Sequence, residues 1–288
     1  MSRAVSIFRR RAPIRLALAR TLLLAFLPIA LQDHSAVNRP AGKTPPVKEI
    51  LISPEAKIYP PPENYTFPLQ QTLVYNAEWH SFNAGTARLH LESSDQGRHA
   101  VVVADSAGLV NFFYKVHDSF RTTFDPRTFC SVGIAKHTEE GSRKRETDVR
   151  FDYARRKSVL REKNLKTGEI RDVEHEIPSC VTDTMSGFYY LGSLPFQNGT
   201  RYVFPLNDGG QTAEITATVE GREQLKTSLG AFNAVRIAAL ATAGPLKNKG
   251  RIWVWYSDDG QRLPLQMRAN VKWGTLTVRL IRVEKNQS

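Results

Sequence analysis

Residues with side chains suited to catalysis or metal binding are scattered along this 288-residue chain and form no familiar motif. The sequence has no Gly-x-Ser-x-Gly elbow, no Walker loop, no Gly-x-Gly-x-x-Gly turn and no His-Glu-x-x-His. His90 and Glu92, like His137 and Glu139, stand two apart and would share a strand face, but two ligands are too few for a metal site. We therefore expect a protein that is not an enzyme and that holds no metal or other cofactor.

Two polar features have a structural explanation. Asp258 and Asp259 could act as a carboxylate pair, but the following Gly260 favours a hairpin turn. Ser186 stands beside Gly187 with no base nearby in the sequence, so helix packing explains it better than nucleophilic catalysis.

The chain has two cysteines, Cys130 and Cys180. In an exported protein such a pair is a candidate disulfide, and closing its loop would stabilise the fold by about 4 kcal/mol in the chain-entropy view. The alternative is two buried free thiols. A redox pair is disfavoured because the spacing is not Cys-x-x-Cys.

Apolar residues that could contact a ligand are the remaining candidates for a functional site. After a cap at Thr182 or Asp183, the residues Met185, Phe188 and Tyr189 recur near helical spacing. A single apolar helix among strands must be buried. These three residues are therefore candidate contacts for a lipophilic ligand or, alternatively, residues of the hydrophobic core.

Two tryptophans are the other candidates for ligand contact. Trp253 and Trp255 would project to one face of a strand, with Ile252, Val254 and Tyr256 on the other. Because both faces are apolar, we expect this strand to be central and buried, and a ligand-stacking platform is the alternative.

Strands dominate the elements that must position these residues. From Leu73 onward apolar and polar residues alternate with period two between turn signals, which predicts roughly a dozen strands. We expect an all-β, mainly antiparallel fold: a strongly curved sheet or open half-barrel with one short helix near 183–194 buried in its concave face.

Three segments follow from composition. Residues 1–36, with six arginines before the apolar run Thr21–Leu31, are a predicted export signal, with an uncleaved anchor as the alternative. Residues 37–71 are proline-rich and are expected to be extended and poorly packed, as a linker or arm, within which residues 50–52 and 58–59 could pack on the domain surface. Residues 72–285 are expected to form a single β domain.

The net charge of +12 falls to +7 once residues 1–36 are set aside. Export excludes nucleic acid as a plausible partner, and this basicity fits either solubility or contact with anionic lipid or polysaccharide. Two basic clusters, 143–145 and 155–157, fit solvated turns, with a lipid-headgroup contact as the alternative. Peripheral membrane contact is thus an expectation, and the oligomeric state is open.

Several short motifs together resemble the exported bacterial family catalogued as domain of unknown function 3108. The resemblance covers about residues 72–284 and depends on Tyr75, Trp79 and Gly85, Asp125-Pro126 with Thr128, residues 140–143 before Phe151-Asp152-Tyr153, Asp183 with Ser186, Tyr189-Tyr190-Leu191, residues 230–236, and residues 255–259 with Arg262-Leu263-Pro264. Two departures are Gly192, where an arginine usually follows Tyr-Tyr-Leu, and Cys130-Ser131, in place of a more apolar stretch. If that arginine has a function in relatives, this chain lacks it.

The resemblance implies the periplasm or cell envelope of a Gram-negative-type bacterium and, by analogy of architecture, a half-barrel similar to periplasmic lipid-handling proteins. We therefore expect a non-catalytic binding module for a lipophilic or acyl-bearing ligand. The alternative is a structural or assembly factor of the envelope that binds another protein.

Overall fold

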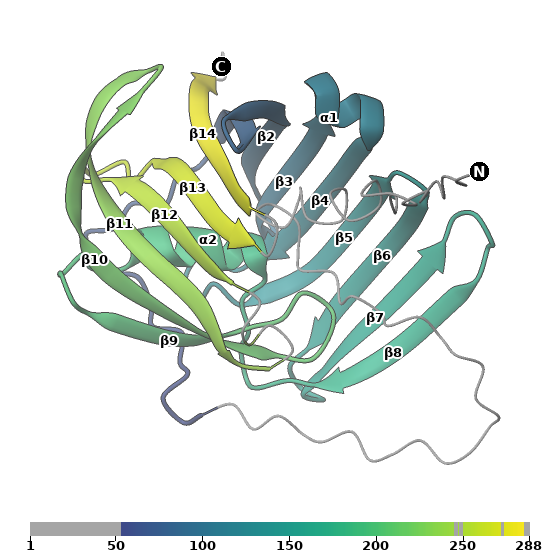
Figure 1. Cartoon of the computed structure of the whole chain (residues 1–288). Helices are drawn as coiled ribbons and strands as arrows, with labels where there is room; N and C mark the ends of the chain where they lie inside the picture. Colours follow the sequence, from purple (N-terminus) through teal and green to yellow (C-terminus); the bar gives the residue numbers. More distant parts are fainter. Residues whose placement is uncertain (1–52, 245–246, 248–249, 272–273, 285–288) are drawn as a thin grey trace, which may run out of the picture.

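The computed structural model describes residues 53–244, 247, 250–271 and 274–284 (Figure 1). The predicted signal, residues 1–36, and the first part of the proline-rich segment lie outside the described residues. Within the described part there are fourteen strands and two helices: β1 Gln71–Trp79, β2 Phe82–Ser94, β3 Gly97–Ser106, α1 Gly108–Phe113, β4 Val116–Phe124, β5 Ser131–Glu140, β6 Arg143–Asp152, β7 Lys157–Asn164, β8 Ile170–Glu176, α2 Thr184–Ser193, β9 Arg201–Leu206, β10 Ala213–Thr227, β11 Gly230–Ala243, β12 Arg251–Ser257, β13 Pro264–Val271 and β14 Gly274–Glu284.

All fourteen strands belong to one sheet in the order β8-β7-β6-β5-β4-β3-β2-β1-β14-β13-β12-β11-β10-β9. Neighbouring strands are antiparallel throughout. The first strand, β1, pairs with the last strand, β14, as well as with β2. The edge strands β8 and β9 do not pair with each other, so the sheet is open. The predicted all-β antiparallel fold is confirmed.

Alternation along each strand produces the core. In β2, Ala87, Leu89 and Leu91 are buried while the intervening side chains face outward, as the period of two requires. Bulges in β1 and β10 interrupt the register and increase the local twist, which helps the sheet to curve.

Helix α2 lies between the two halves of the sheet (Figure 1). Every residue from Met185 to Ser193 is buried, so this helix is surrounded by protein on all sides, as a helix that is apolar on every face must be. The prediction of one short buried helix inside a curved sheet is confirmed.

A loop after β9 ties the helix to the opposite half of the sheet. The Lys136 ammonium on β5 donates to the Asp208 carbonyl oxygen at 2.7 Å, and the Thr184 backbone N–H donates to the Asp208 carboxylate at 3.1 Å. Gly209 adopts a φ of +104° and packs so closely on Val149 that a Cβ would lie 2.5 Å from its side chain. The loop therefore bridges the two halves where the strands themselves do not meet.

The described part of the proline-rich segment packs on the domain, contrary to the expectation of poor packing. Lys57 donates its backbone N–H to the Val203 carbonyl oxygen on the edge strand β9 at 2.8 Å. Ile58, Tyr65 and Phe67 pack against the hydrophobic core. Proline restricts the backbone of this strap in the unfolded chain too, which lowers the entropy lost on docking.

Candidate functional site

The three helical residues singled out from the sequence are part of the core. Met185 and Tyr189 are almost fully buried, and the Phe188 ring lies 5.8 Å from that of Tyr256 on β12. Tyr256 also donates its hydroxyl proton to the Phe188 carbonyl oxygen at 2.7 Å. These contacts occupy the space between helix and sheet.

The two tryptophans lie on the opposite face of β12 from α2. Tyr256 faces the helix, and side chains alternate along a strand, so Trp253 and Trp255 point the other way. Trp255 donates its indole N–H to Glu223, and the Arg268 guanidinium lies 5.6 Å from its ring centroid. The structure therefore does not bring the helical candidates and the tryptophans into one site.

A buried polar network fixes the start of α2. The Asp183 carboxylate accepts the backbone N–H groups of Met185 and Ser186, while its second oxygen accepts the hydroxyls of Thr122 and Ser131. Burial, reinforced by the charge of Asp208, raises the pKa of Asp183, and the hydrogen bonds oppose that rise. Since all these acceptor positions are occupied, the network serves to position the helix.

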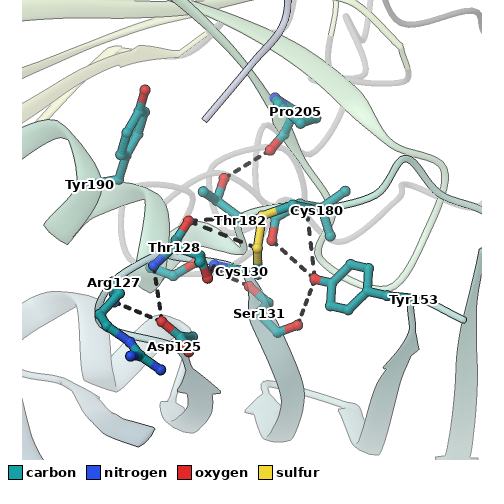
Figure 2. The surroundings of a disulfide bond; sticks show 12 residues. Asp125, Arg127, Thr128, Cys130, Ser131, Tyr153, Cys180, Thr182, Tyr190 and Pro205 are labelled. Carbon is teal, nitrogen blue, oxygen red and sulfur yellow. Dashed lines mark hydrogen bonds between the residues drawn. A yellow bond between two sulfur atoms is a disulfide. The ribbon is translucent and has the colours of Figure 1, made fainter. Parts of the chain in front are cut away.

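The disulfide between Cys130 and Cys180 lies beside this network (Figure 2). It joins the residue before β5 to the segment leading into α2, across a sequence separation of 50. Next to it, the Tyr153 hydroxyl donates to the Ser131 carbonyl oxygen at 2.7 Å, and Ser131 donates its N–H to the carbonyl oxygen of Val181. The disulfide and these hydrogen bonds thus hold the start of β5 against the segment that precedes Asp183.

A pocket of about 500 Å³ opens beyond the C-terminal end of α2. Three segments line it: the strap around Tyr65, the residues 193–196 that end α2, and the turn 258–262 between β12 and β13. Its volume is in the range of small-molecule sites. Leu194, Phe196 and the ring of Tyr65 supply apolar wall, and Arg262 supplies a cation.

Arg262 is held beside the pocket by stacking and by one carboxylate. Its guanidinium carbon lies 3.8 Å from the centroid of the Phe196 ring, and its Nη1 lies 3.7 Å from an oxygen of Asp258. That oxygen distance is too long for a hydrogen bond, and Nη1 is buried without a hydrogen-bond partner in the described part of the chain. Burial lowers the pKa of Arg262, with Asp258 opposing, but a guanidinium remains charged at neutral pH.

Both acidic residues of the turn are already engaged. Arg222 donates from Nε to Asp258 at 2.7 Å, and Asp259 accepts the Ser257 hydroxyl and the backbone N–H of Gln261. The hairpin turn predicted at Asp259-Gly260 joins β12 to β13, and the Asp259 side chain organises it. An incoming acceptor would meet Arg262 without displacing these bonds.

Behind the pocket is a small void of about 10 Å³. Tyr65 and Arg262 border both spaces, and Phe188 and Tyr189 border the inner one. The Tyr189 hydroxyl is buried without a hydrogen-bond partner in the described residues, and burial strongly raises its pKa. A space of this size holds at most one water, so this void is too small for an acyl chain.

The described residues contain no group of three His, Cys, Asp or Glu side chains placed to hold a metal ion. His90 and Glu92 do approach to 3.6 Å and His137 and Glu139 to 3.3 Å, as ion pairs along a strand face. In the described part of the chain, neither helix has the length and apolar character needed to cross a bilayer.

Fold and site together define a class: an open, barrel-like antiparallel sheet wrapped around one helix, with a pocket at the end of that helix. The sequence profile of the proteins of unknown function DUF3108 matches residues 74–281, and the chain belongs to that family. No curated protein matches the chain.

One solved structure shares this architecture, and two others are more distantly similar. A β-barrel-like protein of the DUF1849 family from Brucella abortus has a TM-score of 0.54 at 10% identity, over 76% of this chain and 99% of that one. A predicted exported protein with a YmcC-like fold from Bacteroides fragilis (TM-score 0.32, 9% identity, 77% and 98% coverage) and a predicted lipoprotein from Parabacteroides distasonis (TM-score 0.30, 9%, 77% and 98%) are more remote. The Brucella structure supports the fold and nothing further.

Sequence reasoning missed the residues that line the pocket. Tyr65 falls in the segment that we expected to be a poorly packed linker, and no pattern in the sequence assigned a ligand contact to Phe196 or Arg262. An arginine directly after an acidic turn was the available signal, but nothing local shows that Arg222 already neutralises Asp258.

Proposed function

We propose that this chain is a non-catalytic binding protein of the cell envelope that holds a lipophilic, acyl-bearing ligand with an acidic head group. The ligand occupies the pocket at the end of α2, with its head group on Arg262. The observation that carries this proposal is Arg262, which lines a pocket of about 500 Å³ and whose buried Nη1 lacks a hydrogen-bond partner in the described residues.

The chemistry of the wall supports this ligand class. Arginine binds carboxylate and phosphate through charge-assisted hydrogen bonds, which are roughly twice as strong as neutral ones. Burial raises the pKa of Tyr65 to about 12, so its hydroxyl stays protonated and available as a second donor. Leu194 and Phe196 offer apolar surface for the body of the ligand.

An envelope location is supported by two independent features. Residues 1–36 have the charge and apolar pattern of an export signal. The Cys130–Cys180 disulfide is of a kind that persists in oxidising compartments.

The first test is binding of palmitate and of hexadecanol, measured by isothermal titration and native mass spectrometry. We expect one palmitate per chain, and at least about tenfold weaker binding of the alcohol, because the charge-assisted bond to Arg262 contributes roughly 1.5 to 3 kcal/mol. Failure of both probes to bind, together with a purified protein that carries no lipid, would contradict the proposal.

Two variants locate the site. A Cβ on Gly260 meets nothing within 4 Å, so Gly260→Trp should fill the pocket without strain and abolish binding. Arg262→Gln should remove the preference for palmitate over the alcohol. The matched controls are Gln96→Trp in an exposed turn and Arg236→Gln, an ion-paired arginine on β11. Unchanged palmitate affinity in Gly260→Trp would place the ligand elsewhere.

A further inference from the structure

Three phenylalanines are exposed at the end of the sheet opposite the pocket. Phe82 is 69% exposed, Phe112 82% and Phe113 78%, and the last two belong to the short helix α1. Their neighbour Val110 packs inward against the core. Helix α1 therefore presents two aromatic rings to solvent while one apolar side chain anchors it.

Backbone hydrogen bonds align this helix with the neighbouring turns into one rim. Ala107, just before α1, donates to the Ala84 carbonyl oxygen on β2, which places Phe82 at the same end. Gly141 in the β5–β6 turn donates to the Lys115 carbonyl oxygen, and Leu165 in the β7–β8 turn donates to that of Lys144. Figure 1 shows α1 and these two turns along one edge of the molecule.

The rim carries lysines without ion-pair partners. In the described part of the chain, Lys115, Lys163 and Lys166 form no ion pair, and all three are exposed. Lys144 is paired with Glu139 at 2.6 Å. The other charges at this end are Arg143 and Glu140, Arg145 paired with Glu162, and Glu169. Burial raises the pKa of Glu140, and the charge of Arg143 opposes that rise.

We propose that this rim, residues 82, 107–115, 141–144 and 163–170, docks on an anionic membrane surface, with Phe112 and Phe113 inserted at the headgroup boundary. Exposed aromatic rings on a short helix fit the interfacial layer of a bilayer. Unpaired lysines on the same rim are attracted to anionic lipid within a Debye length. Ile170, exposed at the start of β8, extends the apolar contact along the same rim.

The charge pattern favours a lipid surface over a protein partner. The free lysines are divided between the end of α1 and the β7–β8 turn rather than gathered around a recess. Lys115 follows Phe113 by two residues, and Lys163 pairs in register with the exposed Ile170. A planar anionic surface can contact all of them at once. The ligand pocket lies at the other end of the strands and remains accessible in this orientation.

The test uses the full chain with vesicles of phosphatidylcholine alone or with added phosphatidylglycerol. Hydrogen–deuterium exchange gives a local readout that a membrane-bound N-terminal segment does not mimic. We expect residues 107–115 to gain protection only with phosphatidylglycerol vesicles, and the turn 94–97 at the opposite end to stay unchanged.

Variants separate the apolar and electrostatic parts. Phe112→Ser with Phe113→Ser should abolish this protection, and Lys115→Glu with Lys166→Glu should weaken vesicle binding by tenfold or more at low salt. The controls are Leu229→Ser and Ile281→Ser, exposed apolar residues elsewhere, and Arg127→Glu at the opposite end. Protection of 107–115 that is absent, or that persists in the double serine variant, overturns the proposal. The proposal is also overturned if the protein self-associates and the double serine variant abolishes that self-association. The rim would then be an interface between copies of this chain.

Discussion

At the scale of single residues, two buried carboxylates show how environment decides a role. Asp183 has hydrogen-bond donors on both oxygens and caps a helix. Asp118 on β4 accepts one backbone N–H from Glu139, and its other oxygen has no partner among the described residues. Asp183 stabilises the fold through its hydrogen bonds, whereas Asp118 makes the stability of the fold depend on pH.

Replacing Asp183 by alanine should be severely destabilising. The change leaves two helix N–H groups and two buried hydroxyls without their acceptor, and we expect a loss of about 3 to 5 kcal/mol in the free energy of unfolding. Urea denaturation measures it. Asp125→Ala is the matched control, since Asp125 caps a surface turn through Arg127 and Thr128 and should cost only about 1 kcal/mol. An equal loss of unfolding free energy in the two variants would contradict a stabilising role for the Asp183 network.

Asp118 should make the protein less stable as the pH rises. Burial, with repulsion from Glu140, raises its pKa to about 7, against about 3.9 in an unfolded chain. Between these values the folded state binds more protons than the unfolded state, so the contribution of Asp118 to stability falls from pH 4 to pH 7 and is constant above.

Asp118→Asn keeps the acceptor for Glu139 but cannot ionise. We expect this variant to match the wild type near pH 4 and to exceed its stability by at least about 1 kcal/mol at pH 8. Thermal or urea unfolding across this range measures the difference, with exposed Asp95→Asn as control. A difference that does not vary with pH would rule out a raised pKa.

At the scale of elements, α2 is held at its two ends by different means. Its start depends on Asp183 and on the disulfide that ties the preceding segment to β5. Its end meets the strap, whose Phe67 ring lies 5.4 Å from Tyr189 and 5.9 Å from Phe124. The strap therefore completes the core, and removing it would expose one side of the helix.

Removing the disulfide should destabilise the domain without changing its fold. The disulfide restricts the unfolded chain across a sequence separation of 50. Cys130→Ser with Cys180→Ser should therefore lower the free energy of unfolding by about 2 to 4 kcal/mol. Urea denaturation gives the loss, and circular dichroism checks that the sheet is retained. Thiol counting on the unfolded, unreduced protein should find no free thiol, and two would show that the bridge does not form in solution.

At the scale of the whole molecule, the antiparallel order places the two proposed activities at opposite ends. The β1–β2 turn and α1 share one end, and the β12–β13 turn with its pocket lies at the other. A chain docked by Phe112 and Phe113 would hold its pocket away from the membrane. The two proposals are independent: Gly260→Trp should leave vesicle binding intact, and the serine variant of α1 should leave palmitate binding intact.

The sequence by itself determined the elements. Alternation with period two located the start of the sheet, predicted at Leu73 and found in β1 Gln71–Trp79, because side-chain direction along a strand is a local property. The cap at Asp183 and the spacing of Met185, Phe188 and Tyr189 located α2 for the same reason. The cysteines were a candidate pair, but their distance was not available from spacing.

Only the tertiary structure decided which side chains share a site. Tyr65, Phe196 and Arg262 come from three segments far apart in the chain, and they meet because the strap crosses the end of α2 where the β12–β13 turn ends. It likewise separated Trp255 from Phe188 by placing a strand between them. Such proximity depends on sheet curvature and on the docking of irregular segments, which no local pattern encodes.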